Sequence, residues 1–364
     1  MAMNGAVITG TEERALMHRR LIIALLYLLL IDAKGFAETD SAAIKGAPQE
    51  DGTYANPSKS LDHGSFSVRA PFMFRRLGTY FRSGENAPQM QIPDLDRLLG
   101  YGSNGQPSLT WIGHSTMLVQ MGGMSFLTDP IWSKVPSPVP PVGPRRFVPP
   151  PIAIDDLPTI DFVVISHNHY DHLDIPTLRS LAARNAKTLF LVPMGNAALL
   201  RHHGIINVKE LDWGQSLDLA GLTVHCLPAQ HWSKRSLTDT NKTLWSSWAV
   251  ISDSRRFYHA GDTGYFSGFK AIADYLGPFD LAALPIGAYA PRQMMRASHM
   301  NPEEAVTAAI DLKTKTAVAM HFGTFDLSDE PLDQPPGRFK AAATAQGLGE
   351  QQAWVLKIGE TRAF

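Results

Sequence analysis

The sequence predicts an α+β fold in which two β-sheets pack together and helices cover their outer faces. Strand-like apolar segments come first without helices between them, and later strands alternate with helical segments. A hydrophobic fraction of 44% over 364 residues supplies a sizeable core and excludes a wholly disordered chain. The one cysteine, Cys226, excludes an intrachain disulfide and any Cys-x-x-Cys zinc module.

The N-terminal segment has the pattern of a targeting sequence. A basic pair at 19–20 precedes an apolar run of 11 residues at 21–31. A membrane-spanning helix needs roughly 20 apolar residues, whereas the core of a signal peptide needs about 7–15. Gly35 and Ala37 are small residues that suit a cleavage site, so we expect residues 1–37 to be a signal peptide. An uncleaved N-terminal anchor and a buried helix are the alternatives.

Export would place the chain in the periplasm or another extracytoplasmic compartment, peripheral to a membrane or anchored in it, rather than in the cytoplasm. Residues 38–66 are rich in Ser, Gly, Asp and Pro, and we predict a flexible linker there. No repeat or second linker follows, so residues 67–364 are predicted to form one domain.

The first half of this domain is dominated by strands. Gly122-Gly123 separates two apolar segments and predicts a hairpin turn. The proline-rich stretch 135–151 is expected to be a long loop. A Gly-x-Gly-x-x-Gly pattern at 100–105 predicts a flexible loop and no dinucleotide site, because Pro107 and a strand follow it instead of a helix. Strands are expected at 109–112, 117–121 and 124–128.

The second half alternates strands with helices. The segment 301–304, Asn-Pro-Glu-Glu, carries a cap residue, a proline and two acids, which favour a helix N-terminus. Helices are expected at 175–184, 196–203 and 301–312. Strands are expected at 162–166, 189–192, 222–227, 247–252, 256–260, 281–285 and 317–321.

A dense group of metal-ligand residue types follows the apolar strand that begins at Phe162. His167, His169, Asp171 and His172 lie within six residues. Imidazole and carboxylate suit zinc and similar metals. In an extended turn His167 and His169 point the same way, because side chains alternate between the two faces. Asp171 and His172, further along the turn, can bind a second ion. The motif therefore predicts two metal ions.

Four side chains cannot complete two metal shells, so later strand ends must supply the rest. His231, Asp262 and His321 each stand at or just beyond the end of a predicted strand, where loops can gather them into one cleft. We assign His167, His169 and His231 to one ion, and Asp171, His172 and His321 to the other, with Asp262 as the bridge. Two Zn²⁺ are expected, with another divalent transition metal as the alternative.

Three further residues near these strand ends are candidates for supporting roles. Asp129, after a predicted strand, is expected to orient a ligand histidine from outside, with a simple turn cap as the alternative. His114 and His299 flank predicted loops near the cleft, where structural and functional roles are both open.

The ligand pattern resembles that of the metallo-β-lactamase superfamily, a four-layer αββα sandwich with its metals at one edge of the sheets. Longer motifs are similar to those of the N-acylphosphatidylethanolamine-hydrolysing phospholipase D family, over roughly residues 70–360. These motifs are GH at 113–114, LTDP at 127–130, GPRRF at 143–147, QHWSKR at 230–235, DxNKxLWxSW at 239–248, AGDTGY at 260–265, GPFDLAALPIGAY at 277–289, NPEEAV at 301–306 and HFGTF at 321–325.

The resemblance implies a zinc phosphodiesterase that releases N-acylethanolamine and leaves phosphatidic acid. A hydroxide held between two ions about 3.5–4 Å apart would attack phosphorus in line. Asp262 would orient this nucleophile, and His299 would interact with the phosphate or the leaving oxygen. The family has Gln-His where this chain has Ser298-His299, so Ser298 is a candidate determinant of head-group or acyl-chain preference. Tyr170 and Tyr289 are expected either to line an acyl groove or to belong to the core.

The expected partner is a phospholipid at a membrane surface, with a homodimer as a further option. A lactonase or esterase of the same fold is the alternative enzyme, and a non-catalytic metal-binding scaffold is the alternative of another class. Lys and Arg number 33 against 34 Asp and Glu, a net charge of -1. That balance, and the lack of a basic run beside the motif, argue against nucleic acid as a partner.

Overall fold

A computed structural model describes residues 44–57, 64–79, 84 and 86–364 of the chain. The predicted signal peptide at 1–37 lies outside these residues and stays a prediction. Within the described part, no helix combines the length and apolarity that crossing a membrane would require.

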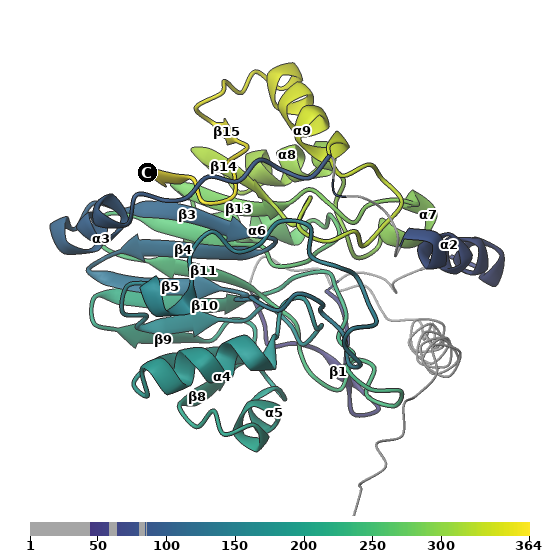
Figure 1. The fold of residues 1–364 in the computed structure, drawn as a ribbon, viewed down its shortest axis with the longest axis horizontal. Helices are drawn as coiled ribbons and strands as arrows, with labels where there is room; N and C mark the ends of the chain where they lie inside the picture. The colour runs from purple at the N-terminus through teal and green to yellow at the C-terminus, as the bar shows by residue number, and fades with distance from the viewer. Residues whose placement is uncertain (1–43, 58–63, 80–83, 85) are drawn as a thin grey trace, which may run out of the picture.

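Two mixed β-sheets form the centre of the molecule (Figure 1), and each has an antiparallel half and a parallel half. In order across the first sheet, the strands are β16 (Thr361–Ala363), β3 (Ser108–Gly113), β4 (Thr116–Met121), β5 (Met124–Thr128), β6 (Phe162–Val164), β7 (Leu189–Pro193) and β8 (Val208–Leu211). In order across the second, they are β15 (Ala353–Trp354), β14 (Thr316–Met320), β13 (Leu281–Pro285), β12 (Arg256–His259), β11 (Ser247–Ile251), β10 (Leu222–Leu227) and β9 (Ser216–Leu219).

The strand β6 explains how the layers form. Side chains alternate between the two faces of a strand. Phe162 and Val164 join the core cluster that lies between the sheets, whereas Val163 and Ile165 join a second cluster under the helices. Both faces of this parallel strand are therefore covered, which is why its sequence is a continuous apolar run.

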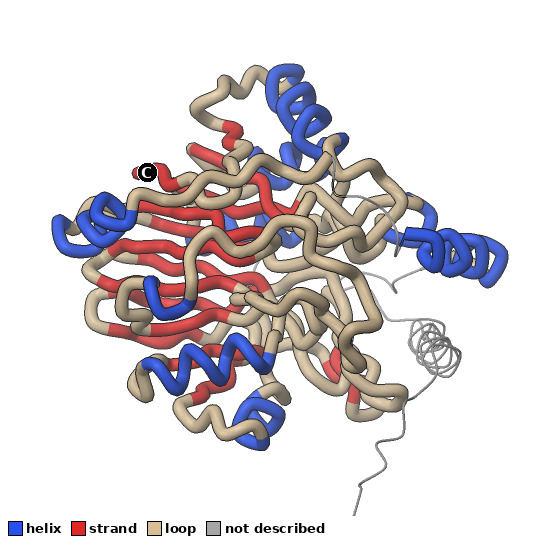
Figure 2. Tube along the Cα trace, in the orientation of Figure 1, coloured by secondary structure: helices blue, strands red, loops and turns tan. Residues whose placement is uncertain are grey.

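Helices cover the outer faces of both sheets, so the predicted αββα sandwich is confirmed (Figure 2). Leu178 and Leu181 of α4 and Leu200 of α5 belong to the cluster on the first sheet, and Ala305 and Val306 of α8 belong to the larger core. Asn301 and Glu304 form a capping box at the start of α8, as the sequence predicts. The helices are α2 (Phe66–Thr79), α3 (Leu95–Asn104), α4 (Ile175–Arg184), α5 (Ala197–His202), α6 (Gly268–Leu276), α7 (Arg292–Met295), α8 (Pro302–Asp311) and α9 (Gln334–Ala345), with a 3-10 turn at Ile154–Asp156.

Long loops gather at one end of the sandwich (Figure 2), where the parallel strands have their carboxyl ends. Asp129 follows β5, His167 follows β6, Asp262 follows β12 and His321 follows β14. Because parallel strands end at the same edge of a sheet, the fold brings these residues together from four separate segments.

The linker predicted at 38–66 is wrong for residues 44–57. This segment contains a short hairpin, β1 (Gln49–Glu50) and β2 (Thr53–Tyr54), and it packs on the domain. Tyr54 belongs to the main core, and Ala47 donates its N–H to Asp212 Oδ1 at 3.0 Å. The polar composition of residues 44–57 suggests a solvated linker, but backbone groups of this segment bond to the folded domain instead of to water.

The loop predicted at Gly100–Gly105 is also wrong. Residues up to Asn104 belong to α3, which Asp94 caps by accepting the N–H of Arg97, and Gly105 ends it in the left-handed conformation. Leu98 and Tyr101 are buried, so packing of one face outweighs the low helix propensity of the two glycines inside it.

Candidate metal centre

The chain turns sharply after β6, and this turn displays the clustered histidines. Ile165 and Ser166 continue the strand direction and are buried, and the N–H groups of His172 and Leu173 both bond to the carbonyl of His169. The turn is therefore closed on itself, and it holds its side chains over the end of the sandwich.

Three histidines aim one ring nitrogen each at a common point. His169 Nδ1 lies 2.8 Å from His167 Nε2 and 3.3 Å from His231 Nε2. Ligands of a tetrahedral Zn²⁺ with Zn–N of about 2.0–2.1 Å lie about 3.3 Å from one another. The two separations of 2.8 and 3.3 Å are thus close to that value, and the third donor pair lies within 4.8 Å.

The other ring nitrogens of two of these histidines fix the tautomers. His231 Nδ1 lies 3.0 Å from the carbonyl oxygen of Ser298, and His167 Nδ1 lies 2.9 Å from Ser166 Oγ. The carbonyl oxygen can only accept, so the proton of His231 sits on Nδ1 and its Nε2 carries a lone pair. With Ser166 Oγ as acceptor, His167 has the same tautomer, and both lone pairs point into the cluster.

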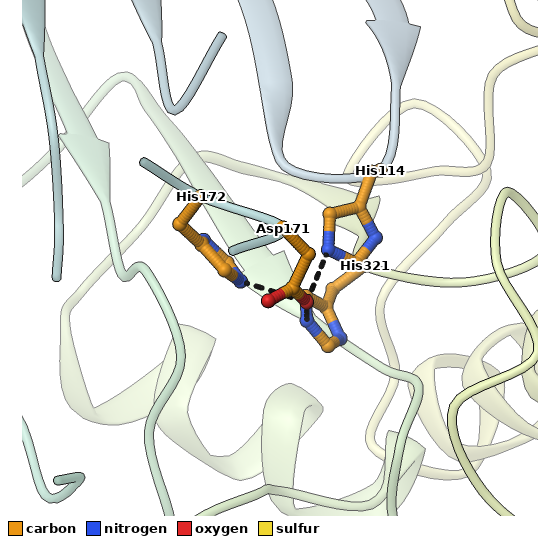
Figure 3. A group of neighbouring side chains, drawn as sticks. All are labelled: His114, Asp171, His172 and His321. Carbon is orange, nitrogen blue, oxygen red and sulfur yellow. Dashed lines mark hydrogen bonds and ion pairs between the residues drawn. The ribbon is translucent and has the colours of Figure 1, made fainter. Parts of the chain in front are cut away.

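A second cluster forms around Asp171 (Figure 3). Its Oδ2 lies 3.0 Å from His114 Nε2, 3.5 Å from His172 Nε2 and 3.8 Å from His321 Nε2. The donor atoms of these four residues all lie within 4.8 Å of one another. The structure thus adds His114 to the expected set of Asp171, His172 and His321.

Asp262 lies between the two clusters, as expected of a bridge. Its Oδ1 is 3.0 Å from His321 Nε2, and its Oδ2 is 3.2 Å from His172 Nε2 and 4.0 Å from His231 Nε2. Gly261 allows this approach, because it has φ +60° and a Cβ there would lie 2.5 Å from Ser166 Cβ.

The polar atoms that converge here fit a bound metal. His172 Nε2, His321 Nε2 and Asp262 Oδ1 are buried and make no well-directed hydrogen bond, although His321 Nε2 and Asp262 Oδ1 lie 3.0 Å apart. Buried polar groups are almost always satisfied, so three such atoms within one site require a partner that can accept lone pairs. A divalent cation is such a partner, and imidazole with carboxylate is a suitable donor set.

The electrostatics of the two clusters differ. Burial lowers the pKa of His167 and of His231 well below the ordinary value, so both imidazoles are neutral. Burial alone would also lower the pKa of His321, but Asp262 and Asp171 outweigh it and raise that pKa to about 9. The carboxylates of Asp262 and Asp171 thus act mainly on the second cluster. A bound cation there would replace the proton of His321.

Asp129 contacts both clusters from outside, directly or through Ser166. Its Oδ2 lies 2.8 Å from His172 Nδ1, 2.7 Å from Ser166 Oγ and 3.0 Å from His259 Nε2. Ser166 in turn contacts His167. Burial would raise the pKa of Asp129, but His172 and His259 outweigh it and hold that pKa below the usual range. The residue remains a carboxylate and fixes one histidine of each cluster.

Three residues of the site adopt the left-handed backbone conformation that L-residues rarely occupy. They are His114 at φ +54°, Asp129 at φ +37° and His321 at φ +60°. Such conformations cost about 1–3 kcal/mol each and persist only where the surrounding structure imposes them. Their concentration here is typical of a functional site.

His299 stands at the open side of the site. Its side chain is 13% exposed, and its Nδ1 lies 3.8 Å from Asp262 Oδ2. Burial lowers the pKa of His299 to about 3, so its imidazole is neutral at pH 7. Among the described residues it is grouped with His231 and Asp262 as a third set of potential ligands.

The three residues expected to touch substrate have different surroundings. Tyr289 belongs to the core, the second of the two alternatives given for it, since it is 2% exposed and its hydroxyl contacts Gln334 of α9. Ser298 is also 2% exposed; its carbonyl oxygen contacts His231 Nδ1, and its N–H bonds to the carbonyl of Met295. Tyr170 is half-buried under Arg235, whose guanidinium carbon lies 3.9 Å from the ring centroid. Substrate contact by Ser298 and Tyr170 stays a prediction.

Sequence reasoning missed Asn56 and Asn168, which fix the loop that carries His231. Asn56 bonds to the backbone of His231, and Asn168 Oδ1 accepts the N–H of Lys234 at 2.9 Å. Asn168 stands inside the histidine motif, so its position was a usable signal. Asn56 lies 175 residues upstream of its partner, and no local pattern marks it.

The two-sheet sandwich and its paired His/Asp clusters define a metal-dependent hydrolase. Residues 125–322 match the family model described as the beta-lactamase superfamily domain, and the chain belongs to that superfamily. Within it, the chain is similar to the phospholipase D enzymes that hydrolyse N-acylphosphatidylethanolamine, which supports an enzyme of hydrolase type.

Three similar proteins illustrate the relationship. N-acyl-phosphatidylethanolamine-hydrolyzing phospholipase D 1 of Caenorhabditis elegans is 44% identical over 240 residues, 62% of this chain and 67% of the relative. The mitochondrial enzyme of that name from Saccharomyces cerevisiae is 34% identical over 70% of this chain and 55% of the yeast enzyme. The structure of Igni18, a metallo hydrolase from Ignicoccus hospitalis, matches with TM-score 0.56 and 26% identity, over 71% of this chain and 98% of that one.

Proposed function

We propose that this protein is a zinc-dependent phosphodiesterase that hydrolyses N-acylphosphatidylethanolamine to N-acylethanolamine and phosphatidic acid. The observation that carries the proposal is the pair of donor clusters joined by Asp262, in a chain 44% identical to an enzyme named for that reaction. His167, His169 and His231 would hold one ion, and Asp171, His172 and His321 the other.

Two bound cations would supply an activated water and a clamp for the phosphate oxygens. Asp262 would keep the two donor clusters in register, since its two oxygens reach histidines of both. In the reaction one water is consumed, the phosphorus–oxygen bond to the ethanolamine breaks, and the ethanolamine oxygen leaves with a proton. His299, neutral and partly exposed, can donate one N–H to a phosphate oxygen or to the leaving oxygen.

A lipid surface is the proposed partner, and two features support it. Phe66 and Phe74 of α2 are 69% and 73% exposed. The same helix packs through Phe72 and Met73 on the methionines of α7, which ends four residues before His299. Exposed aromatic side chains on a helix beside the site favour contact with the headgroup region of a membrane. Export and dimer formation belong to the same proposal.

The decisive experiment is mass spectrometry of the products formed from mixed phospholipids by the full, metal-loaded chain, alongside a panel of lactones. N-acylethanolamine and phosphatidic acid should appear in equal amounts. A ratio of rates on N-acylated and plain phosphatidylethanolamine would measure the head-group preference at issue for Ser298. Turnover of a lactone with no turnover of either lipid would assign the function to the lactonase or esterase alternative.

Elemental analysis tests the metal. Two equivalents of zinc per chain are expected, and active protein with less than one equivalent of any transition metal would contradict a two-metal centre. N-terminal sequencing of protein from its native host tests export. The mature chain should begin near Glu38, and an intact Met1 on cytoplasmic protein would contradict export.

A further inference from the structure

We propose that Asn56 is a positioning residue for His231, so that the upstream segment 44–57 is part of the metal centre. The inference rests on the proposed metal-binding role of His231 but not on the identity of the substrate. The matched family model begins at residue 125, well after Asn56, and therefore contains no counterpart of this contact.

The backbone at His231 needs an outside partner. Strand β10 ends at Leu227, and residues 228–234 have no regular secondary structure. His231 is nevertheless fully buried, so water cannot satisfy its N–H and carbonyl groups. Buried backbone groups of this kind must be paired within the protein.

Asn56 supplies both partners through one side chain. Its Nδ2 donates to the carbonyl of His231 at 2.8 Å, and its Oδ1 accepts the N–H of His231 at 2.9 Å. An amide group bound in this two-point way fixes the position and the orientation of the residue it holds. Asn56 is itself 2% exposed, so neither bond competes with solvent.

The two bonds act together with the contact at the ring. Ser298 holds His231 Nδ1 at 3.0 Å, which sets the tautomer and the tilt of the imidazole. Asn56 holds the backbone from which the imidazole projects. Together they leave His231 Nε2 little freedom except to point at His169 Nδ1, 3.3 Å away.

The segment that delivers Asn56 is fixed at several points. Tyr54 N–H bonds to the carbonyl of Asn241 at 2.7 Å, and Ala55 N–H bonds to the carbonyl of Pro48 at 2.9 Å. Tyr54 is buried in the main core. These contacts fix the backbone immediately before Asn56, because Tyr54 is held both by the core and by the loop at 231–243.

The test is zinc binding by the full chain, measured by competition with a chromogenic chelator. Wild type should bind two equivalents. Asn56→Ala should keep one at wild-type affinity and bind the other about 10–100-fold more weakly, the range typical for loss of an outer partner of a ligand. Cobalt substitution should show a changed visible spectrum for the weakened site, which a general loss of stability would not produce.

A double-mutant cycle with His231→Ala locates the effect. If Asn56 acts through His231, then adding Asn56→Ala to His231→Ala should cause no further loss of metal affinity. A full additional loss in that background would overturn the inference, as would wild-type affinity at both sites in Asn56→Ala. If Asn56→Ala does not fold, Asn56→Ser, which retains a hydroxyl but reaches less far, is measured in the same way.

Asn196→Ala is the matched control. Asn196 is also buried, and its Nδ2 donates to the carbonyls of Pro193 and Leu244 at 2.9 and 3.3 Å, but it contacts neither donor cluster. This variant should lower Tm and leave both zinc equivalents unchanged. Zinc binding without lipid hydrolysis by wild type would contradict the proposed function alone, whereas wild type without zinc would remove the basis of both proposals.

Discussion

At the scale of single residues, outer partners hold the proposed ligands in place. Asp129 is the clearest case, because one carboxylate contacts His172, Ser166 and His259 at 3.0 Å or less. A neutral side chain there would leave several buried donors without a partner, and each costs about 1–3 kcal/mol.

Asp129→Ala is expected to weaken both metal sites, since the carboxylate fixes His172 directly and His167 through Ser166. Metal affinity should fall about 10–100-fold at each site, and the free energy of unfolding should fall by about 3–5 kcal/mol. Zinc titration and chemical denaturation measure the two effects. Ser166→Ala is the comparison, and it should affect the His167 site more than the His172 site. Equal zinc affinity in Asp129→Ala and wild type would contradict the supporting role.

Asp262→Asn is expected to disrupt both sites together. The substitution preserves the shape of the side chain but removes the charge that faces His172, His321 and His231. Activity should fall by more than about 100-fold, because a shared ligand should matter more than its outer partners. His231→Ala should weaken only one site. Near-full activity of Asp262→Asn would show that the bridging assignment is wrong.

At the scale of elements, the ends of strands and the segments beyond them carry the function. Strands β5, β6, β12 and β14 each end one to three residues before a site residue, and these ends lie at the same end of the sandwich. Helix α2 is a different kind of element. It is attached through Phe72 and Met73 and through the ion pairs Arg75–Asp329 and Arg76–Asp326, while Phe66 and Phe74 are exposed.

Replacing the two exposed phenylalanines of α2, Phe66→Ser with Phe74→Ser, is expected to weaken binding to phospholipid vesicles. Burying one such side chain in a membrane contributes about 1.5–3 kcal/mol, so the double variant should bind at least about tenfold more weakly. Vesicle sedimentation measures the binding. Ile206→Ser is the control, because Ile206 is 72% exposed but lies outside α2. Unchanged vesicle binding, with Tm also unchanged, would exclude α2 as the contact surface.

At the scale of the whole molecule, the centre ties the two sheets together, because Asp129, His167 and His172 follow the first sheet and Asp262 and His321 follow the second. Metal binding is therefore expected to stabilise the entire sandwich. A ligand at 100 times its Kd contributes about 2.7 kcal/mol per site.

Removal of metal should lower Tm and change its dependence on pH. In the metal-free protein the pKa of His321 is raised to about 9, so its proton stabilises the fold fully below the ordinary value near 6.5. That contribution is lost as the pH rises through about 9. The chelated protein should therefore lose stability between about pH 6.5 and 9, whereas the metal-loaded protein, with His321 neutral, should not. Calorimetry of both forms across this range decides the matter, and parallel pH profiles would contradict the assignment of His321.

The sequence by itself determined the central strands, the fold class and the residues that meet at the site. Alternating or continuous apolar runs indicate whether one or both faces of a strand are covered. The turn after β6 carries four site residues of the protein within six positions. Helices α2, α6 and α9 were not predicted, although α6 buries Phe269, Ile272, Ala273 and Leu276 at helical spacing and its pattern was a usable signal. Only the tertiary structure showed that Tyr289 is core, that His114 contacts Asp171 and that Asn56 holds His231. Local periodicity reflects burial of a face, but a hydrogen bond across 175 residues leaves no trace in the sequence around either partner.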